Sequence, residues 1–408
     1  MFKDFSSSEL SLECMGFRKL NTSLVLDTQR VDSPPPCEPC RFFDLFTEAD
    51  GNEEVVRFQY EGDPRIYDSG KMLNIAYRRN KDDPNCMENK ILDSEDFTEV
   101  EALFQVYPDF PPASFFYDTV TRVTLKTIDG ELKVIVTEDL DAIISYLPVP
   151  PSLSHIPTVP ITELEKINMV DMNVDRVKWR GDTYAFKISG DMLEGQGTLR
   201  ELAIIDQLSK SPNIINLVAI VVNHDSTIRG FLVPFMRSGN LESVFENARK
   251  SIGLSDNDNA TAFNWPLKLS WARQVTQAVV ELHAILAYNG DLKPQNILID
   301  STGQALLIDF LPMGTSDEFA SPELLEMSHS WHGINFESVL SAPADIYSLG
   351  LVLCAVAEER WRGMPTPVWR EGKTPNWYRD IVKRCLVFVP EARPSAIEVL
   401  SLLEREGT

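Results

Sequence analysis

The sequence predicts an α+β fold, with a β-rich part followed by a larger, mostly helical part. A strand-like run rich in Val and Thr occupies residues 119–126, a second strand-like run occupies residues 132–136, and Asp129-Gly130 lies between them. An Asp-Gly pair between two such runs is a strong hairpin signal. Further along, apolar residues recur at the spacing of one helix face. They are Leu269, Ala272, Val275, Val279 and Leu282.

Length and charge limit the possible functions. At about 150 residues per domain, 408 residues allow two or three domains. The net charge of −23 repels polyanions. We therefore expect neither nucleic acid nor a membrane surface as a main partner.

Cysteine usage and hydropathy predict the compartment. Cys37 and Cys40 have the spacing of metal ligands, but no second ligand pair follows, and a structural zinc normally takes four ligands. The start of the chain does not resemble a secretion signal, and no apolar run is long enough to cross a bilayer. These features predict an intracellular protein, cytoplasmic or nuclear.

Composition changes along the chain predict four regions. Residues 1–50 are polar and interrupted by a run of prolines, as in a loosely ordered arm. Residues 51–147 are β-rich. Residues 148–159 form a proline-rich linker that neither a helix nor a central strand accommodates. Residues 160–405 form the remaining domain.

One short loop carries the residue types of phosphoryl transfer. That reaction needs a carboxylate to orient the attacking hydroxyl, a cation near the moving group and oxygen ligands for Mg²⁺. Asp291, Lys293 and Asn296 supply all three within six residues. Asp309, at the end of an apolar run, offers a second oxygen ligand.

The segment D-L-K-P-Q-N at 291–296 resembles the catalytic loop of eukaryotic Ser/Thr protein kinases, and Asp309-Phe310 resembles their metal-binding motif. The resemblance spans residues 160–405. It implies a bilobal protein kinase-like fold, with a small β-rich N-lobe and a larger, mostly helical C-lobe. It also implies ATP and Mg²⁺ as cofactors, Asp291 and Lys293 as catalytic residues, and Asn296 and Asp309 as metal ligands.

Two further motifs extend the nucleotide site. Y-A-F-K-I resembles the family's third strand, so Lys187 would anchor the ATP phosphates and Glu201, on the next helix, would pair with it. F-L-V-P-F-M resembles the fifth strand and hinge. The C=O of Pro234 and the N–H of Met236 would then contact adenine.

The phosphate-binding loop departs from the family pattern. The corresponding residues 166–174 contain no glycine, whereas kinases cover the phosphates with a glycine-rich loop. The carboxylates of Asp171 and Asp175 would lie where the backbone should approach phosphate. We therefore expect weaker or differently shaped nucleotide binding.

Other departures from the family pattern lie at positions that regulate activity in protein kinases. Gly290 replaces the arginine that pairs with a phosphorylated activation loop, so such phosphorylation is not expected to be the main switch. Asn289 replaces the histidine that in the family packs under the phenylalanine of the metal-binding motif, here Phe310. Its loss predicts weaker packing between the two lobes. Leu311 replaces a glycine and should restrict a hinge. The segment 309–323 is short, although 314–316 resembles the family's Gly-Thr step.

The second half of the domain keeps the structural motifs of the family. Asp345 resembles the helix residue that holds the catalytic-loop backbone. Glu323 and Arg393 resemble a buried ion pair. We interpret His283 as structural.

These features favour a divergent ATP-dependent Ser/Thr protein kinase that transfers the γ-phosphoryl group of ATP to a hydroxyl of a protein substrate. Two alternatives remain open. The glycine-free loop favours a pseudokinase scaffold that keeps the fold, with or without nucleotide binding. The short activation segment permits a small-molecule phosphotransferase.

Overall fold

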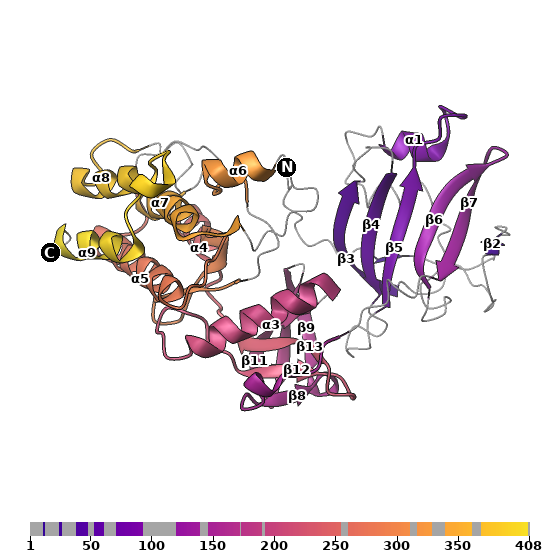
Figure 1. Cartoon of the computed structure of the whole chain (residues 1–408), viewed down its shortest axis with the longest axis horizontal. Coiled ribbons are helices and arrows are strands. Elements are labelled where there is room, and N and C mark those ends of the chain that lie inside the picture. Colours follow the sequence, from indigo (N-terminus) through magenta and orange to yellow (C-terminus); the bar gives the residue numbers. More distant parts are fainter. Residues whose placement is uncertain are drawn as a thin grey trace. The chain divides into compact units, whose positions relative to one another are not determined.

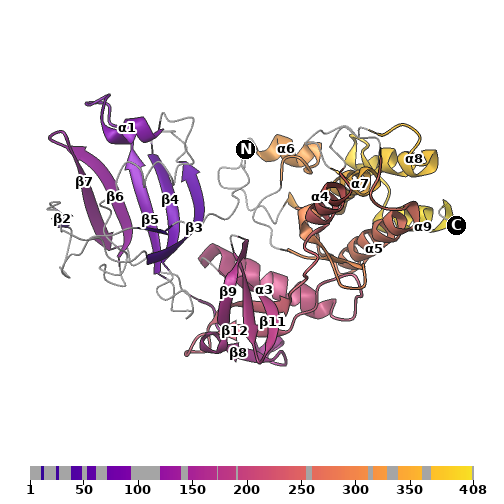
Figure 2. The same ribbon diagram turned by 180° about the vertical axis from the view of Figure 1, so that it is seen from behind.

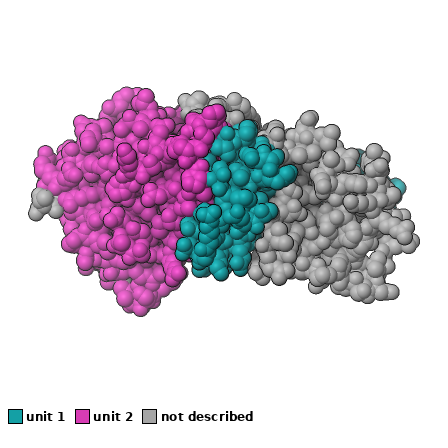
Figure 3. Space-filling model, turned by 90° about the horizontal axis from the view of Figure 1, so that it is seen from below, with its two compact units in different colours: residues 1–149, 158–192, 220–231 teal, residues 150–157, 193–219, 232–408 magenta. Residues whose placement is uncertain are grey.

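The computed structural model describes thirteen stretches of the chain: residues 11–12, 24–26, 38–47, 53–60, 71–92, 120–138, 146–171, 173–189, 192–253, 260–310, 316–328, 339–360 and 369–406. The chain forms two compact units (Figure 3). The first contains residues 1–149, 158–192 and 220–231. The second contains residues 150–157, 193–219 and 232–408.

The first unit contains a seven-stranded sheet in the order β1-β3-β4-β5-β6-β7-β2 (Figure 1). Neighbouring strands pair antiparallel except for β5 and β6, which are parallel. The short helix α1 (Met87–Leu92) lies between β5 and β6 in the chain. The strands are β1 (Ser11–Leu12), β2 (Leu24–Leu26), β3 (Glu38–Thr47), β4 (Glu53–Tyr60), β5 (Lys71–Arg78), β6 (Val120–Ile128) and β7 (Glu131–Glu138).

The predicted hairpin is confirmed. Ile128 pairs with Glu131 across the turn, and Asp129 and Gly130 both have positive φ, at 53° and 81°. Two positive φ angles define the turn that suits the twist of a two-residue hairpin. Strands β1, β2 and β3 occupy parts of the stretch expected to be a loose arm. The four region boundaries stay a prediction.

A second sheet has six strands in the order β8-β12-β13-β11-β10-β9 (Figure 2). Lys187 lies in β11 and Pro234 ends β13. Gly230 of β13 has φ of 140°, and a Cβ at this position would lie 2.0 Å from the backbone oxygen of Lys187. The strands are β8 (Thr158–Pro160), β9 (Glu165–Asp171), β10 (Val174–Trp179), β11 (Asp182–Ile188), β12 (Ala219–Val222) and β13 (Ile228–Pro234).

The second unit is mainly helical. Helix α5 packs against α7 and α9, and α7 also packs against α8 (Figure 1). A small sheet pairs β14 (Ile297–Ile299) with β15 (Ala305–Leu307). The helices are α3 (Met192–Gln207), α4 (Leu241–Ser251), α5 (Trp265–Ala284), α6 (Pro322–Ser328), α7 (Ala342–Glu358), α8 (Asn376–Cys385) and α9 (Ala396–Glu406).

Helix α7 forms the centre of this unit because its sequence is apolar on every face. Residues 344–358 are all buried, as expected for a helix surrounded by other elements. Ser341 caps its start by accepting a hydrogen bond from the backbone N–H of Ala344, and Glu359, with φ of 52°, ends it. Gly350 brings α8 close, since a Cβ there would lie 2.7 Å from Cβ of Cys385.

The proline-rich segment belongs to the second unit. Residues 151–153 form a 3₁₀ turn that buries Leu153, and Ile156 is also buried. His155 Nε2 lies 2.8 Å from a carboxylate oxygen of Asp206 on α3. Part of the predicted linker therefore packs onto this unit.

The predicted pair of Glu323 and Arg393 is confirmed. Nη1 and Nη2 of Arg393 donate to the two carboxylate oxygens of Glu323 at 2.6 and 2.8 Å. Arg393 also donates to the carbonyl oxygens of Pro343, Val387 and Phe388, and its side chain is fully buried. This guanidinium therefore joins α6, the start of α7 and the segment before α9.

Among the residues that the structure describes, no helix is both long and apolar enough to cross a membrane.

We predict that Gly230→Ala destabilises the first unit, because β13 must move away from the Lys187 backbone to make room for the added Cβ. The expected loss in the free energy of unfolding is about 1–3 kcal/mol, the usual cost of overpacking. Thermal and denaturant unfolding measure the effect. Gly303→Ala is the matched control, since Gly303 also has positive φ but open space around its Cβ position. Equal losses in both variants would contradict the steric explanation.

We predict that Glu323→Gln costs about 3 kcal/mol near neutral pH, because it leaves the buried Arg393 charge unpaired. Burial raises the pKa of Glu323, but the hydrogen bonds and the positive charge of Arg393 outweigh burial and lower this pKa. A lowered carboxyl pKa stabilises the fold above the unfolded value of about 4.3, and this contribution is lost as pH falls through the folded pKa.

The stability difference between wild type and Glu323→Gln should therefore shrink below about pH 4.3. Denaturant unfolding from pH 3 to 7 tests this, with the exposed Glu391→Gln as control. A difference that stays constant with pH would show that the ion pair is not its source.

Candidate active site

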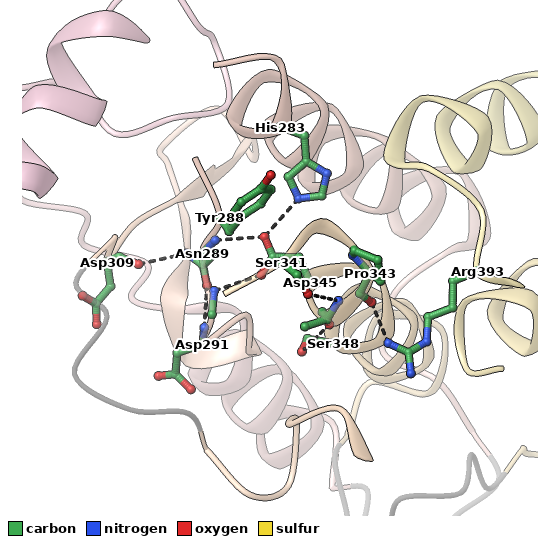
Figure 4. Close-up of polar contacts among 12 residues, drawn as sticks. His283, Tyr288, Asn289, Asp291, Asp309, Ser341, Pro343, Asp345, Ser348 and Arg393 are labelled. Atoms are coloured by element: carbon green, nitrogen blue, oxygen red, sulfur yellow. Dashed lines mark hydrogen bonds and ion pairs between the residues drawn. The ribbon is translucent and has the colours of Figure 1, made fainter. Parts of the chain in front are cut away.

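A buried carboxylate on α7 organises the loop 289–296. Asp345 is 1% exposed, and its oxygens accept hydrogen bonds from the backbone N–H groups of Asn289 and Gly290, both at 2.9 Å (Figure 4). His283 Nε2 lies 3.0 Å from the same carboxylate. Asp345 thus holds the loop backbone as predicted, and His283 has a structural position.

Asn289 joins this loop to the Asp309 segment. Its Nδ2 donates to the carbonyl oxygen of Asp309 at 2.9 Å, and its Oδ1 accepts from the backbone N–H of Asp291 at 3.1 Å (Figure 4). The side chain is buried, where satisfied hydrogen bonds are worth most. Asn289 thus makes a polar link between these two segments, and the weaker link expected from the loss of histidine stays a prediction.

The backbone at Asp309 is held in an uncommon conformation. Its φ is 62°, in the left-handed region that few non-glycine residues adopt. On one side, the N–H of Ile308 donates to the carbonyl of Asn296 at 3.0 Å. On the other, the N–H of Phe310 donates to the carboxylate of Glu201 at 3.2 Å, and Phe310 is fully buried. Leu311 lies outside the described residues.

The structure brings Asp291, Lys293 and Asn296 together. Lys293 Nζ lies 2.6 Å from Oδ2 of Asp291. Asn296 Nδ2 donates to the backbone oxygen of Asp291 at 2.9 Å and more weakly to its Oδ2 at 3.4 Å. The Asp291 carboxylate is thus oriented beside a cation while its side chain remains 17% exposed.

Ser316 is a member of this cluster whose role the sequence did not reveal. Its backbone N–H donates to Oδ1 of Asp291 at 2.7 Å, and its hydroxyl accepts from Lys293 Nζ at 2.8 Å. The resemblance of 314–316 to a Gly-Thr step pointed to this segment without assigning a contact. Gly314 and Thr315 lie outside the described residues.

The other predicted nucleotide contacts are placed as follows. Glu201, on α3, is 2% exposed and binds the Phe310 N–H. Lys187 is half-buried in β11. Its pairing with Glu201 stays a prediction. Pro234 ends β13, and Met236 follows in a turn closed by the Gly239 N–H donating to its carbonyl at 3.1 Å.

The glycine-free stretch forms strand and tight turn. Residues 165–171 are β9, and Val174 of β10 already pairs with Asp171. Asp175 is fully buried and lies 3.4 Å from Nζ of Lys166. The expectation that Asp175 faces the phosphates is therefore wrong: its position on the buried face of β10 places its carboxylate beside Lys166.

The donor set fits Mg²⁺, which prefers carboxylate and carbonyl oxygens. Because Nδ2 of Asn296 is held by Asp291, the amide oxygen is the atom free to turn toward a metal. The N–H of Ile308 donates to the Asn296 carbonyl and so joins this residue to the segment ending at Asp309. Among the described residues no cluster of three or more His, Cys, Asp or Glu side chains could hold a metal.

We predict that Asn289→Ala lowers the free energy of unfolding by about 1–3 kcal/mol, because the Asp309 carbonyl and Asp291 N–H lose their buried partner. Denaturant unfolding followed by fluorescence measures the loss. Asn376→Ala, at an exposed position opening α8, is the control and should change stability little. A neutral Asn289→Ala would show that the bridge does not stabilise the loop.

Comparison with known proteins gives a consistent result. The chain is 27% identical over 257 residues to the liver/testis phosphorylase b kinase gamma catalytic chain of Mus musculus, covering 54% of this chain and 59% of that one. It is also 27% identical over 242 residues to a probable cell division protein kinase of Encephalitozoon cuniculi, covering 51% and 81%. A probable serine/threonine-protein kinase MARK-C of Dictyostelium discoideum is 30% identical over 179 residues, covering 42% and 21%.

The family model described as the protein kinase domain matches residues 174–402, more than half of the chain. The match contains the Asp291 loop, Asp309, Asp345 and the pair of Glu323 and Arg393. The predicted α+β, bilobal protein kinase-like fold is thereby confirmed. This chain, with its N-terminal region, belongs to the protein kinase domain family.

Proposed function

We propose that this protein is an active, divergent Ser/Thr protein kinase that uses ATP and Mg²⁺. The observation that carries the proposal is the Asp291 carboxylate, oriented by the Ser316 N–H and by Lys293. A scaffold that only binds partners does not need a partly exposed carboxylate held beside a cation and an amide ligand. Such groups are the parts that phosphoryl transfer uses.

In this mechanism Asp291 accepts a hydrogen bond from the substrate hydroxyl and takes its proton as transfer proceeds. The hydroxyl oxygen forms a bond to the γ-phosphorus while the bond from that phosphorus to the bridging oxygen of ADP breaks. Lys293, 2.6 Å from Asp291, stabilises the negative charge that passes between these groups.

Other residues position the nucleotide. Asn296 and Asp309 would hold Mg²⁺, which when bound neutralises phosphate charge. Lys187 would bind the phosphates and pair with Glu201, and the backbone at Pro234 and Met236 would contact adenine. The hydrogen bonds of Asn289 to the Asp309 carbonyl and the Asp291 N–H would keep these two residues in a fixed relative position around the nucleotide.

We further propose that the acceptor is a Ser or Thr hydroxyl of an intracellular protein. Support comes from the D-L-K-P-Q-N loop and from the Ser/Thr kinase name of the Dictyostelium relative. The phosphorylase kinase chain extends well beyond the aligned part, so nothing about its substrate is carried over.

A pseudokinase is the second candidate. It is favoured by the tight β9–β10 connection, where Val174 pairs with Asp171 and no glycine lets the backbone approach phosphate. On this hypothesis the chain keeps the fold and binds partners without turnover.

We predict that Asp291→Asn and Lys187→Met each reduce γ-phosphoryl transfer from ATP by about 10²–10⁴-fold, as removal of a proton acceptor or a phosphate anchor should. Transfer from labelled ATP is measured with Mg²⁺, a generic basic protein and, separately, a panel of small metabolites. The control is Asp380→Asn on α8, whose exposed carboxylate pairs with Lys383 at the surface.

Transfer that Asp291→Asn does not reduce would contradict the assignment of the base. If the wild type shows no transfer while ATP raises its melting temperature, the pseudokinase is correct. Labelling of a metabolite rather than of protein would establish a small-molecule phosphotransferase.

A further inference from the structure

Strand β10 carries an arginine on the same face of its sheet as Lys187. In the pairing of β10 with β11, Arg176 lies opposite Ala185, and Val174 lies opposite Lys187. Side chains two residues apart on a strand share a face, and diagonal neighbours on adjacent strands lie about 7–8 Å apart, within reach of long side chains. Arg176 is therefore a diagonal neighbour of Lys187.

Burial separates the two faces of these strands. The side chains that alternate with Arg176 and Lys187 are fully buried in the core, namely those of Asp175, Val177 and Phe186. Arg176 and Lys187 are only half-buried. The face that carries the two cations is thus the more accessible one.

The carboxylate next to Arg176 in the chain belongs to the buried face. Asp175 is fully buried, and its Oδ2 lies 3.4 Å from Nζ of Lys166. Lys166 pairs with Val177 across β9 and β10, so it lies on the same face as Asp175. Asp171, the last residue of β9, is exposed to water, which weakens the interactions of its charge.

The backbone is irregular on both sides of Arg176. The pairing of β10 with β9 shifts register between Val174 and Asp175, and again between Arg176 and Val177. Such bulges change the direction of a side chain and are common beside active sites. The irregularity therefore lies where the strand presents Arg176.

The chemistry of the glycine-free loop calls for another donor. Residues 166–174 contain no glycine, so their backbone N–H groups cannot approach phosphate as a glycine-rich loop does. A guanidinium carries five N–H donors in a planar fork that binds phosphate oxygens through two parallel hydrogen bonds. Arg176 places this group beside the phosphate anchor Lys187.

We propose that Arg176 is a phosphate-binding residue of the nucleotide site and supplies donors that the glycine-free loop lacks. The ligand is a nucleoside di- or triphosphate, whose phosphate oxygens contact both Arg176 and Lys187. The inference rests on the proposed function only for the role of Lys187 as phosphate anchor. It requires nucleotide binding and not turnover.

The test compares ADP with adenosine, because the two ligands differ in the phosphates. Binding to the full-length protein is measured by isothermal titration calorimetry in the presence of Mg²⁺. In Arg176→Met the dissociation constant of ADP should rise by at least about tenfold, since charge-assisted hydrogen bonds are lost. The dissociation constant of adenosine should stay within about twofold of wild type.

Lys178→Met is the matched control. Lys178 is an exposed cation two residues further along β10, opposite Thr183 and away from Lys187. This variant should bind ADP like wild type. If Arg176→Met does not fold, Arg176→Lys takes its place. Lysine keeps the charge but loses the planar fork, so ADP affinity should still fall while adenosine affinity does not.

The outcomes separate this inference from the proposed activity. Equal ADP affinity in wild type and the Arg176 variant would overturn the role of Arg176. Tighter binding by the variant would overturn it too and show that the side chain occupies the site. Equal losses for ADP and adenosine would show structural support instead of phosphate contact.

Two results concern the nucleotide site as a whole. A wild type that binds no ADP would refute both this inference and the nucleotide contacts of the proposed function. Binding of ADP that depends on Arg176, without phosphoryl transfer from ATP, would support this inference and contradict only the proposed activity.

Discussion

The geometry of the candidate active site depends on one buried carboxylate. The position of Asp345 is fixed by α7, because residues 344–358 of this helix are all buried against neighbouring elements. Its two oxygens bind the N–H groups of Asn289 and Gly290 and so set the path of the loop that carries Asp291. The buried helix thereby determines where the Asp291 loop lies.

The departures from the family pattern are compensated locally. Asn289 lacks an aromatic ring, yet its amide donates to the Asp309 carbonyl and accepts from the Asp291 N–H. Gly290 lacks the arginine side chain, but its φ of 78° suits the tight bend of the loop. Ser316 completes the cluster by holding the Asp291 carboxylate from the activation segment. With these substitutions the Asp291 carboxylate still lies beside Lys293 and Asn296.

Charge in the second unit is arranged unlike the acidic surface that the composition suggests. The buried Arg393 pairs with the half-buried Glu323, and Lys268 pairs with Glu359, where both side chains are buried. Burial lowers the pKa of Lys268, and the carboxylate of Glu359 opposes this effect. Paired charges of this kind favour one arrangement of the helices over others.

The sequence by itself determined the family, the hairpin at Asp129-Gly130 and the positions of Asp291, Lys293 and Asn296. Each of these follows from residues close together in the chain, where spacing alone brings groups together. Only the tertiary structure decided that Ser316 binds Asp291 and that Asp175 lies beside Lys166. These contacts depend on how separate segments pack and on which face of a strand is buried, and local sequence does not encode either.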